Sequence, residues 1–248
     1  MSNPQDEDII DEFRKHLSQK DFPCIGAKTA LASGQLKCMV AYHMGCPHQD
    51  GEVLQFIYDF VDQFRNSGSL YHSVAVLFRQ PVDLNEEIFE KLLWERLQSL
   101  SDLDALQYKY DPRVSENMAS PYFSFSLKSE AFFIIGLNPE SKHASRRFTY
   151  PAIIFNPHLQ FQTLRETEKY NHLKSVIRKR DIQYSGTINP VLKDFGEASE
   201  VFQYSGRLQD ENWQCPLKIN HGKINPHTTA QRSIIHFKKE PVFKGDRH

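Results

Sequence analysis

The sequence lacks long uncharged apolar runs, an excess of charge of one sign, and a signal-peptide pattern. Its 248 residues carry 30 lysines and arginines against 31 aspartates and glutamates, a formal net charge of -1. This balance gives no electrostatic reason to expect a nucleic-acid or membrane partner. Because the N-terminal segment is acidic and no run is long enough to span a bilayer, we expect a cytoplasmic protein.

Closely spaced cysteines are also missing. Cys24, Cys38, Cys46 and Cys215 form no C-x-x-C pair, so neither a zinc site nor a disulfide framework is indicated. Reduced thiols are expected. The sequence has no G-x-G-x-x-G fingerprint, which argues against a built-in flavin or nicotinamide site.

What is present is typical of one large domain, residues 1–248, because the hydrophobic fraction of 40% suffices for a proper core. Apolar residues at helical spacing predict helices over 7–19, 24–33, 52–66, 86–100 and 168–180, and apolar or alternating runs predict strands over 37–43, 73–78, 122–128, 131–137 and 152–155. Alternation of strands and helices in the first half predicts an α+β or α/β fold, a mixed sheet with packed helices.

Two later segments differ from this pattern. The helix over 168–180 is basic, and its lysines and arginines are interpreted as a solvated face rather than a nucleic-acid site. Residues 184–215 are rich in Gly, Ser, Asn and Gln, which predicts a long loop-rich region. The tail after about residue 240 is expected to fray.

The chemically densest stretch covers 138–165, with two histidines, three arginines and a short apolar run. Pro151 precedes the run and Asn156-Pro157 follows it, which predicts a buried strand between two turns. His143 and His158 then lie at opposite ends of a strand that spans roughly 15 to 20 Å. Unless the turns fold back, the two histidines do not share one metal.

Several motifs in and around this stretch resemble the YqcI/YcgG family. They are His143, Ser145 to Phe148, Pro151, Phe155 to Phe161, Asn189-Pro190, Gly196, Ser199-Glu200, Gln203 to Arg207, Trp213, Cys215-Pro216 and, upstream, Phe22-Pro23-Cys24. Members with a known activity are haem-dependent N-hydroxylases of guanidino compounds, in guanitoxin and D-cycloserine biosynthesis. The resemblance therefore implies haem b, dioxygen, a small substrate related to arginine, and an external reductase as electron donor.

A haem iron needs an axial ligand, and the candidates here are Cys215, Cys24 and His158. Cys215 is the first choice, because the proline after it removes one backbone amide that would compete for the sulfur. Trp213, two residues earlier, is a candidate to flank the porphyrin. Cys24 and His158 stay open as alternatives.

Arginine is suited to the haem propionates because its guanidinium binds carboxylates with two hydrogen bonds. Arg146, Arg147 and Arg207 are the candidates. Adjacent residues on a strand point to opposite faces, so only one of Arg146 and Arg147 is expected to reach the cofactor.

A buried guanidinium substrate would need a carboxylate partner. Glu200 and Asp194 are the candidates for this clamp, and Tyr204 is a candidate to hydrogen-bond oxygen or substrate. His143 is a candidate distal acid or propionate contact. The apolar wall of the pocket would come from strand phenylalanines, namely Phe125, Phe133 and Phe155.

Other functions are compatible with the same residues. The first is a non-haem iron oxygenase, with His143, His158 and one carboxylate as a facial triad. The second is a cytoplasmic haem-binding protein without enzymatic activity. The third is an interaction module without any cofactor.

Overall fold

A five-stranded mixed sheet in the order β1-β2-β5-β4-β3 forms the centre of the computed structural model. Its strands are β1 (Leu36–His43), β2 (Ser73–Gln80), β3 (Phe125–Leu127), β4 (Glu130–Leu137) and β5 (Ala152–Pro157). Only β1 and β2 pair in parallel, and the other neighbours are antiparallel. The structure describes residues 3–167, 169–210 and 212–223. The tail expected to fray lies outside these residues.

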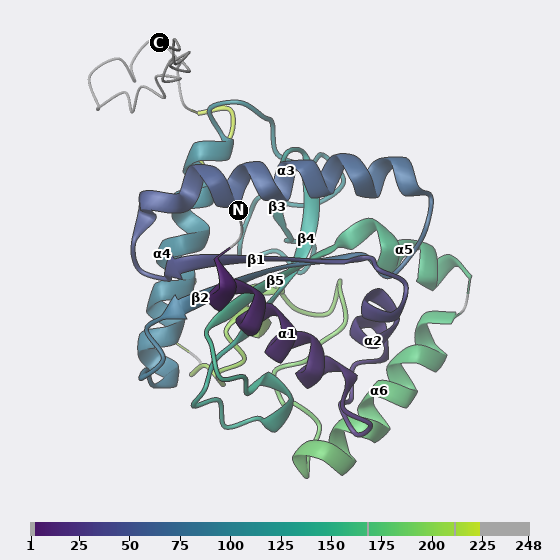
Figure 1. Ribbon diagram of the computed structural model, residues 1–248. Helices are drawn as coiled ribbons and strands as arrows, with labels where there is room; N and C mark the ends of the chain where they lie inside the picture. Colours follow the sequence, from purple (N-terminus) through teal and green to yellow (C-terminus); the bar gives the residue numbers. More distant parts are fainter. Residues whose placement is uncertain (1–2, 168, 211, 224–248) are drawn as a thin grey trace, which may run out of the picture.

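Helices cover both faces of the sheet (Figure 1). One face carries α3 (Asp50–Ser67) and α4 (Glu86–Asp104). The other carries α1 (Pro4–Ser18) and α2 (Ile25–Ala32), with α5 (His158–Glu166) and α6 (Lys169–Ser185) continuing the layer beside them. Three short helices occupy the connections: η1 (Pro47–Gln49), η2 (Ala144–Arg146) and α7 (Val201–Tyr204).

The strand alternation explains why both faces are covered. In β2, Val74, Val76 and Phe78 join the hydrophobic core under α3 and α4, while Ala75 and Leu77 join the core under α1 and α2. All five side chains are buried. A strand with apolar residues on both faces must be covered on both, so the uninterrupted apolar run fixes β2 in the middle of the sheet.

The fold is a single α+β domain, as the pattern predicted. The predicted hairpin between β3 and β4 is confirmed, and Lys128 and Ser129 both adopt a φ of 52°, which suits a two-residue turn. Helix α5 was not predicted, because Asn156-Pro157 was interpreted only as a turn. Proline is well tolerated where a helix begins, and Pro157 is the residue before α5.

No helix within the described ranges is long and apolar enough to cross a membrane.

Gly136→Ala tests the packing between β4, α4 and α7. An added Cβ would lie 2.8 Å from the Phe89 ring and 2.9 Å from the Tyr204 carbonyl oxygen, and overpacking of this kind costs about 1–3 kcal/mol. Gly26→Ala in α2 is the matched control, since its Cβ would meet nothing closer than 3.8 Å. Urea unfolding should show a lower free energy of unfolding for Gly136→Ala but not for Gly26→Ala. Equal free energies of unfolding for the two variants would contradict this packing.

Candidate functional site

Two adjacent cavities lie between the sheet and the layer formed by α1, α2, α5 and α6. The first has a volume of about 240 Å³ and a mainly apolar lining, drawn from α1, α2, β4, β5 and α6. The second, of about 190 Å³, lies between α5, α6 and the segment before α7. They share five lining residues, namely Phe133, Phe161, Leu173, Ile177 and Leu192. The two cavities are therefore neighbours across one apolar wall.

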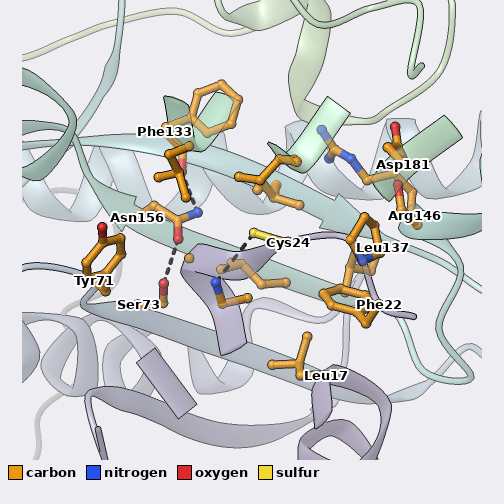
Figure 2. Close-up of a pocket in the computed structure, with 18 of the residues that line it drawn as sticks. Leu17, Phe22, Cys24, Tyr71, Ser73, Phe133, Leu137, Arg146, Asn156 and Asp181 are labelled. Atoms are coloured by element: carbon orange, nitrogen blue, oxygen red, sulfur yellow. Dashed lines mark hydrogen bonds between the residues drawn. The ribbon is translucent and has the colours of Figure 1, made fainter. Parts of the chain in front are cut away.

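Cys24 lies on the wall of the first cavity, where Figure 2 shows its sulfur between the two polar ends of the pocket. The residue is the N-cap of α2, and its sulfur accepts a hydrogen bond from the Ala27 amide at 3.4 Å. Burial raises the pKa of the thiol, while the amides of Ala27 and Gly26 and the charge of Arg146 oppose that rise. These amide donors are already placed to stabilise the thiolate that would bind a metal cation.

Arg146 lies at one end of the first cavity with Asp181 beside it (Figure 2). The side chain is only 5% exposed, and it donates to the carbonyls of Gly136 and Gln203, both at 3.2 Å. Burial lowers the pKa of this guanidinium to about 10. No carboxylate among the described residues lies within 4.0 Å of it, and the nearby charge of Asp181 only partly offsets the effect of burial. The guanidinium could therefore pair with an anionic ligand in the cavity.

Asp181 connects the cavity to the loop before β5. It accepts hydrogen bonds from His143 Nε2 at 2.8 Å, from the Ser185 hydroxyl at 3.0 Å and from the Asn189 amide at 3.1 Å. His143 is thereby fixed to Asp181, while Asp181 itself lines the cavity. His143 would therefore act on a cofactor in this cavity only indirectly, through the Asp181 carboxylate.

The opposite end of the first cavity is also polar. Ser73 donates to the Asn156 side-chain oxygen at 2.6 Å, and the Asn156 amide group donates to the Phe133 carbonyl at 3.2 Å (Figure 2). Gln160 bonds both backbone groups of His72. These bonds connect β2, β4, β5 and α5 at this end of the cavity.

The second cavity holds His158 and Glu200 at its buried side. The His158 Nε2 atom lies 3.7 Å from Glu200 Oε1, which is too long for a hydrogen bond, and Nε2 has no other partner within the described chain. Burial raises the pKa of Glu200 to about 8 and lowers that of His158 to about 4. Near pH 7, both groups are mainly neutral in this arrangement.

Four basic side chains lie among mainly apolar residues in the rest of the second cavity's lining. Arg165 lies over the rings of Tyr170 and Phe195, at 4.7 and 5.6 Å from their centroids. Lys174 pairs with Asp194 at 2.5 Å. Arg178 and Lys193 complete the set of cations in this lining. An anionic group at the outer side of this cavity would be attracted by several of them.

The structure separates the sequence candidates into two groups. Cys24, Arg146, His158, Glu200 and Asp194 line the two cavities. Of the predicted apolar wall, Phe133 lines both cavities, whereas Phe125 and Phe155 belong to the hydrophobic core.

The other candidates line neither cavity. Cys215 packs beside the first core, and burial raises its pKa to about 12. Trp213 packs on Trp94 and Phe202.

The remaining arginines and Tyr204 are also engaged elsewhere. Arg207 pairs with Glu87 and Glu90. Arg147 is exposed and donates to the Ser141 carbonyl. Tyr204 is fully buried, and its hydroxyl contacts Phe125 N and Glu200, so it positions Glu200.

Sequence reasoning missed Asp181, Asn156 and Arg165. Asp181 is the one acidic residue in the basic run of α6, and that isolated acid was the available signal. Asn156 was treated as a turn residue and Arg165 as part of a motif-rich stretch. Their roles depend on partners distant in sequence, as in the contact between Asn156 and Ser73.

Comparison of the sequence with known protein families gives a match. The family model described as "YqcI/YcgG family" matches residues 13–218. The chain belongs to the YqcI/YcgG family. Every residue that lines the two cavities falls inside the matched region.

A relative supports this membership over a similar length. The chain is 30% identical over 223 residues to a Bacillus subtilis (strain 168) protein named "Uncharacterized protein YqcI", covering 85% of this chain and 86% of that protein. No solved structure was found to match.

Glu200→Gln is expected to flatten the pH dependence of stability. Between about pH 4.5 and about pH 8 the folded wild type keeps a proton on Glu200 that the unfolded chain has lost. Wild-type stability should therefore fall as pH rises through this window, and the glutamine, which does not titrate, should remove that slope. Urea unfolding at several pH values measures it, with the exposed Glu197→Gln as control. Parallel curves for wild type and Glu200→Gln would contradict the buried neutral acid.

Proposed function

We propose that the protein is a haem-dependent monooxygenase that uses dioxygen to N-hydroxylate a guanidino compound related to arginine. One observation supports this proposal most strongly. The Cys24 thiol faces an apolar cavity, and at the end of this cavity lies a buried arginine that has Asp181 nearby but no carboxylate of the described chain within 4.0 Å. A thiol for the iron and a cation for a propionate are two of the groups that a haem site would need.

The residues present fit haem in three respects. The lining of the first cavity is mostly aliphatic and aromatic, which suits the faces of a porphyrin. The Cys24 sulfur already accepts a backbone hydrogen bond at the start of α2, and metal coordination would keep it deprotonated despite burial. Arg146 has a guanidinium suited to a propionate. We therefore assign Cys24 as the ligand, in preference to Cys215 and His158.

A haem bound through Cys24 would supply oxygen activation, which a thiolate ligand favours. The protein's part is to position the substrate in the neighbouring cavity. Glu200 would accept the cationic guanidino end, and Arg165 with Arg178 would attract a carboxylate at the other end. Phe133 and Phe161 form the apolar wall between the two cavities.

Electrons would come from a separate reductase, because the sequence carries no G-x-G-x-x-G fingerprint for a flavin or nicotinamide. We place the reaction in the cytoplasm, where such donors and reduced thiols are found.

The facial-triad alternative has weaker support. His143 uses Nε2 to bind Asp181, whereas His158 lines the other cavity. No three His, Cys, Asp or Glu side chains of the described part of the chain are grouped as a metal site. A non-enzymatic haem-binding protein would use the same Cys24 cavity, and turnover distinguishes it from the enzyme.

Cys24→Ser is expected to abolish the thiolate signature of the haem-loaded protein. After expression with a haem precursor, the wild type should show a Soret band and, when reduced with carbon monoxide, the red-shifted band of a thiolate ligand. Cys215→Ser is the matched control, since that thiol is also partly buried but lines neither cavity. Loss of the signature in Cys215→Ser alone would overturn the ligand assignment, and a wild type without a Soret band would overturn the proposed function.

A further inference from the structure

The buried side of the second cavity presents two polar atoms without hydrogen-bond partners in the described chain. Glu200 is 3% exposed and His158 is 2% exposed. His158 Nε2 has no partner, and Glu200 Oε1 makes no hydrogen bond, since the contacts of this carboxyl with Ser124 and Tyr204 both use Oε2. Because Oε1 and Nε2 are 3.7 Å apart, one ligand with several N–H groups can donate to both.

Ser124 can adapt to either protonation state of Glu200. The Ser124 hydroxyl lies 3.1 Å from the Phe132 carbonyl and 3.0 Å from Glu200 Oε2. A hydroxyl has one proton and cannot donate to both oxygens at once. If Glu200 carries a proton on Oε2, it donates to Ser124 and Ser124 donates to Phe132, so all three groups are satisfied.

An ionised Glu200 would change this arrangement. Ser124 would have to turn its proton to the carboxylate and give up its bond to the Phe132 carbonyl, although Phe132 would still pair with Phe125 in the β3–β4 ladder. The preference for the neutral acid therefore comes from burial, because Glu200 is 3% exposed and no lysine or arginine of the described residues lies within 4.0 Å of its carboxyl.

The charged groups around Glu200 do not reverse this preference. No lysine or arginine of the described residues lies within 4.0 Å of its carboxyl, and His158 is the one ion-pair partner recorded there. Burial raises the pKa of Glu200 to about 8, although the hydrogen bonds from Ser124 and Tyr204 and the charge of Arg165 oppose this rise. The other titratable groups facing this region are Tyr110, Asp111 and Arg113 behind the cavity, Tyr204 on α7, Lys174 and Arg178 on α6, and Lys193 and Asp194 before α7.

We propose that binding of a cationic N–H ligand in the second cavity displaces one proton from Glu200 to solvent. The O–H bond of the carboxylic acid breaks, the proton passes to buffer, and the carboxylate pairs with the bound cation. His158 accepts a second N–H of the same ligand and stays neutral. The choice of a cationic ligand rests on the proposed function, but the release of the proton does not require haem chemistry.

The affinity of the protein for the cationic ligand should then depend on pH. Each cation bound releases one proton, so the association constant should rise about tenfold per pH unit below pH 8 and level off above it. A neutral analogue of the same shape gains nothing from ionising Glu200. Its binding should therefore release no proton.

Calorimetry of the protein purified after expression with a haem precursor tests the proposal with L-arginine, agmatine and the neutral L-citrulline. Titration near pH 7 in two buffers of different ionisation enthalpy counts the protons. We expect close to one proton released per arginine or agmatine bound, none for citrulline, and none for Glu200→Gln. Glu197→Gln, which removes an exposed carboxylate of the same segment, should release the proton like the wild type.

Infrared difference spectra supply a readout that does not depend on the folding of a variant. Addition of arginine to the wild type should remove a carboxylic-acid C=O band. Binding without proton release, or no binding by either cation, would overturn the proposal. Proton-linked binding in a protein that takes up no haem would instead leave this inference standing and overturn the proposed function.

Discussion

The buried guanidinium of Arg146 joins the parts of the molecule on which the candidate site depends. Its two hydrogen bonds reach the Gly136 carbonyl on β4 and the Gln203 carbonyl on α7, so one side chain fixes the loop-rich C-terminal part against the sheet. Gly206 packs directly on its aliphatic part. Burying this cation at 5% exposure is costly, and Asp181 offsets only part of that cost because it lies beyond ion-pair distance. An anionic ligand group bound at Arg146 would offset more of it.

The two cavities near this cation differ in their linings, so each suits a different kind of ligand. The first is apolar, with the Cys24 thiol at its wall and polar groups at its ends. The second is lined by charged side chains and holds the buried His158 and Glu200. In the proposed enzyme the first would hold the cofactor and the second the substrate. The shared apolar wall would then keep the reacting nitrogen next to the cofactor and away from bulk water.

Periodicity predicted the sheet and most helices, because these depend on neighbours in sequence. It did not predict α5, since Asn156-Pro157 has the composition of a turn and nothing local shows that a helix follows. The choice among ligands shows the same limit. Cys215 was preferred on a local argument about its proline, whereas the structure places Cys24 and not Cys215 in the lining of the first cavity. Contacts such as His143 with Asp181 and Ser124 with Glu200 join residues 38 and 76 positions apart, and no spacing rule reveals them.

The proposed enzyme would hold haem in the first cavity through Cys24. A crystal structure of the haem-loaded protein tests this assignment most directly. We predict iron bonded to the Cys24 sulfur, the porphyrin between the sheet and α6, and a propionate on Arg146. Iron bonded to Cys215 or His158, or a porphyrin bound outside this cavity, would contradict the assignment.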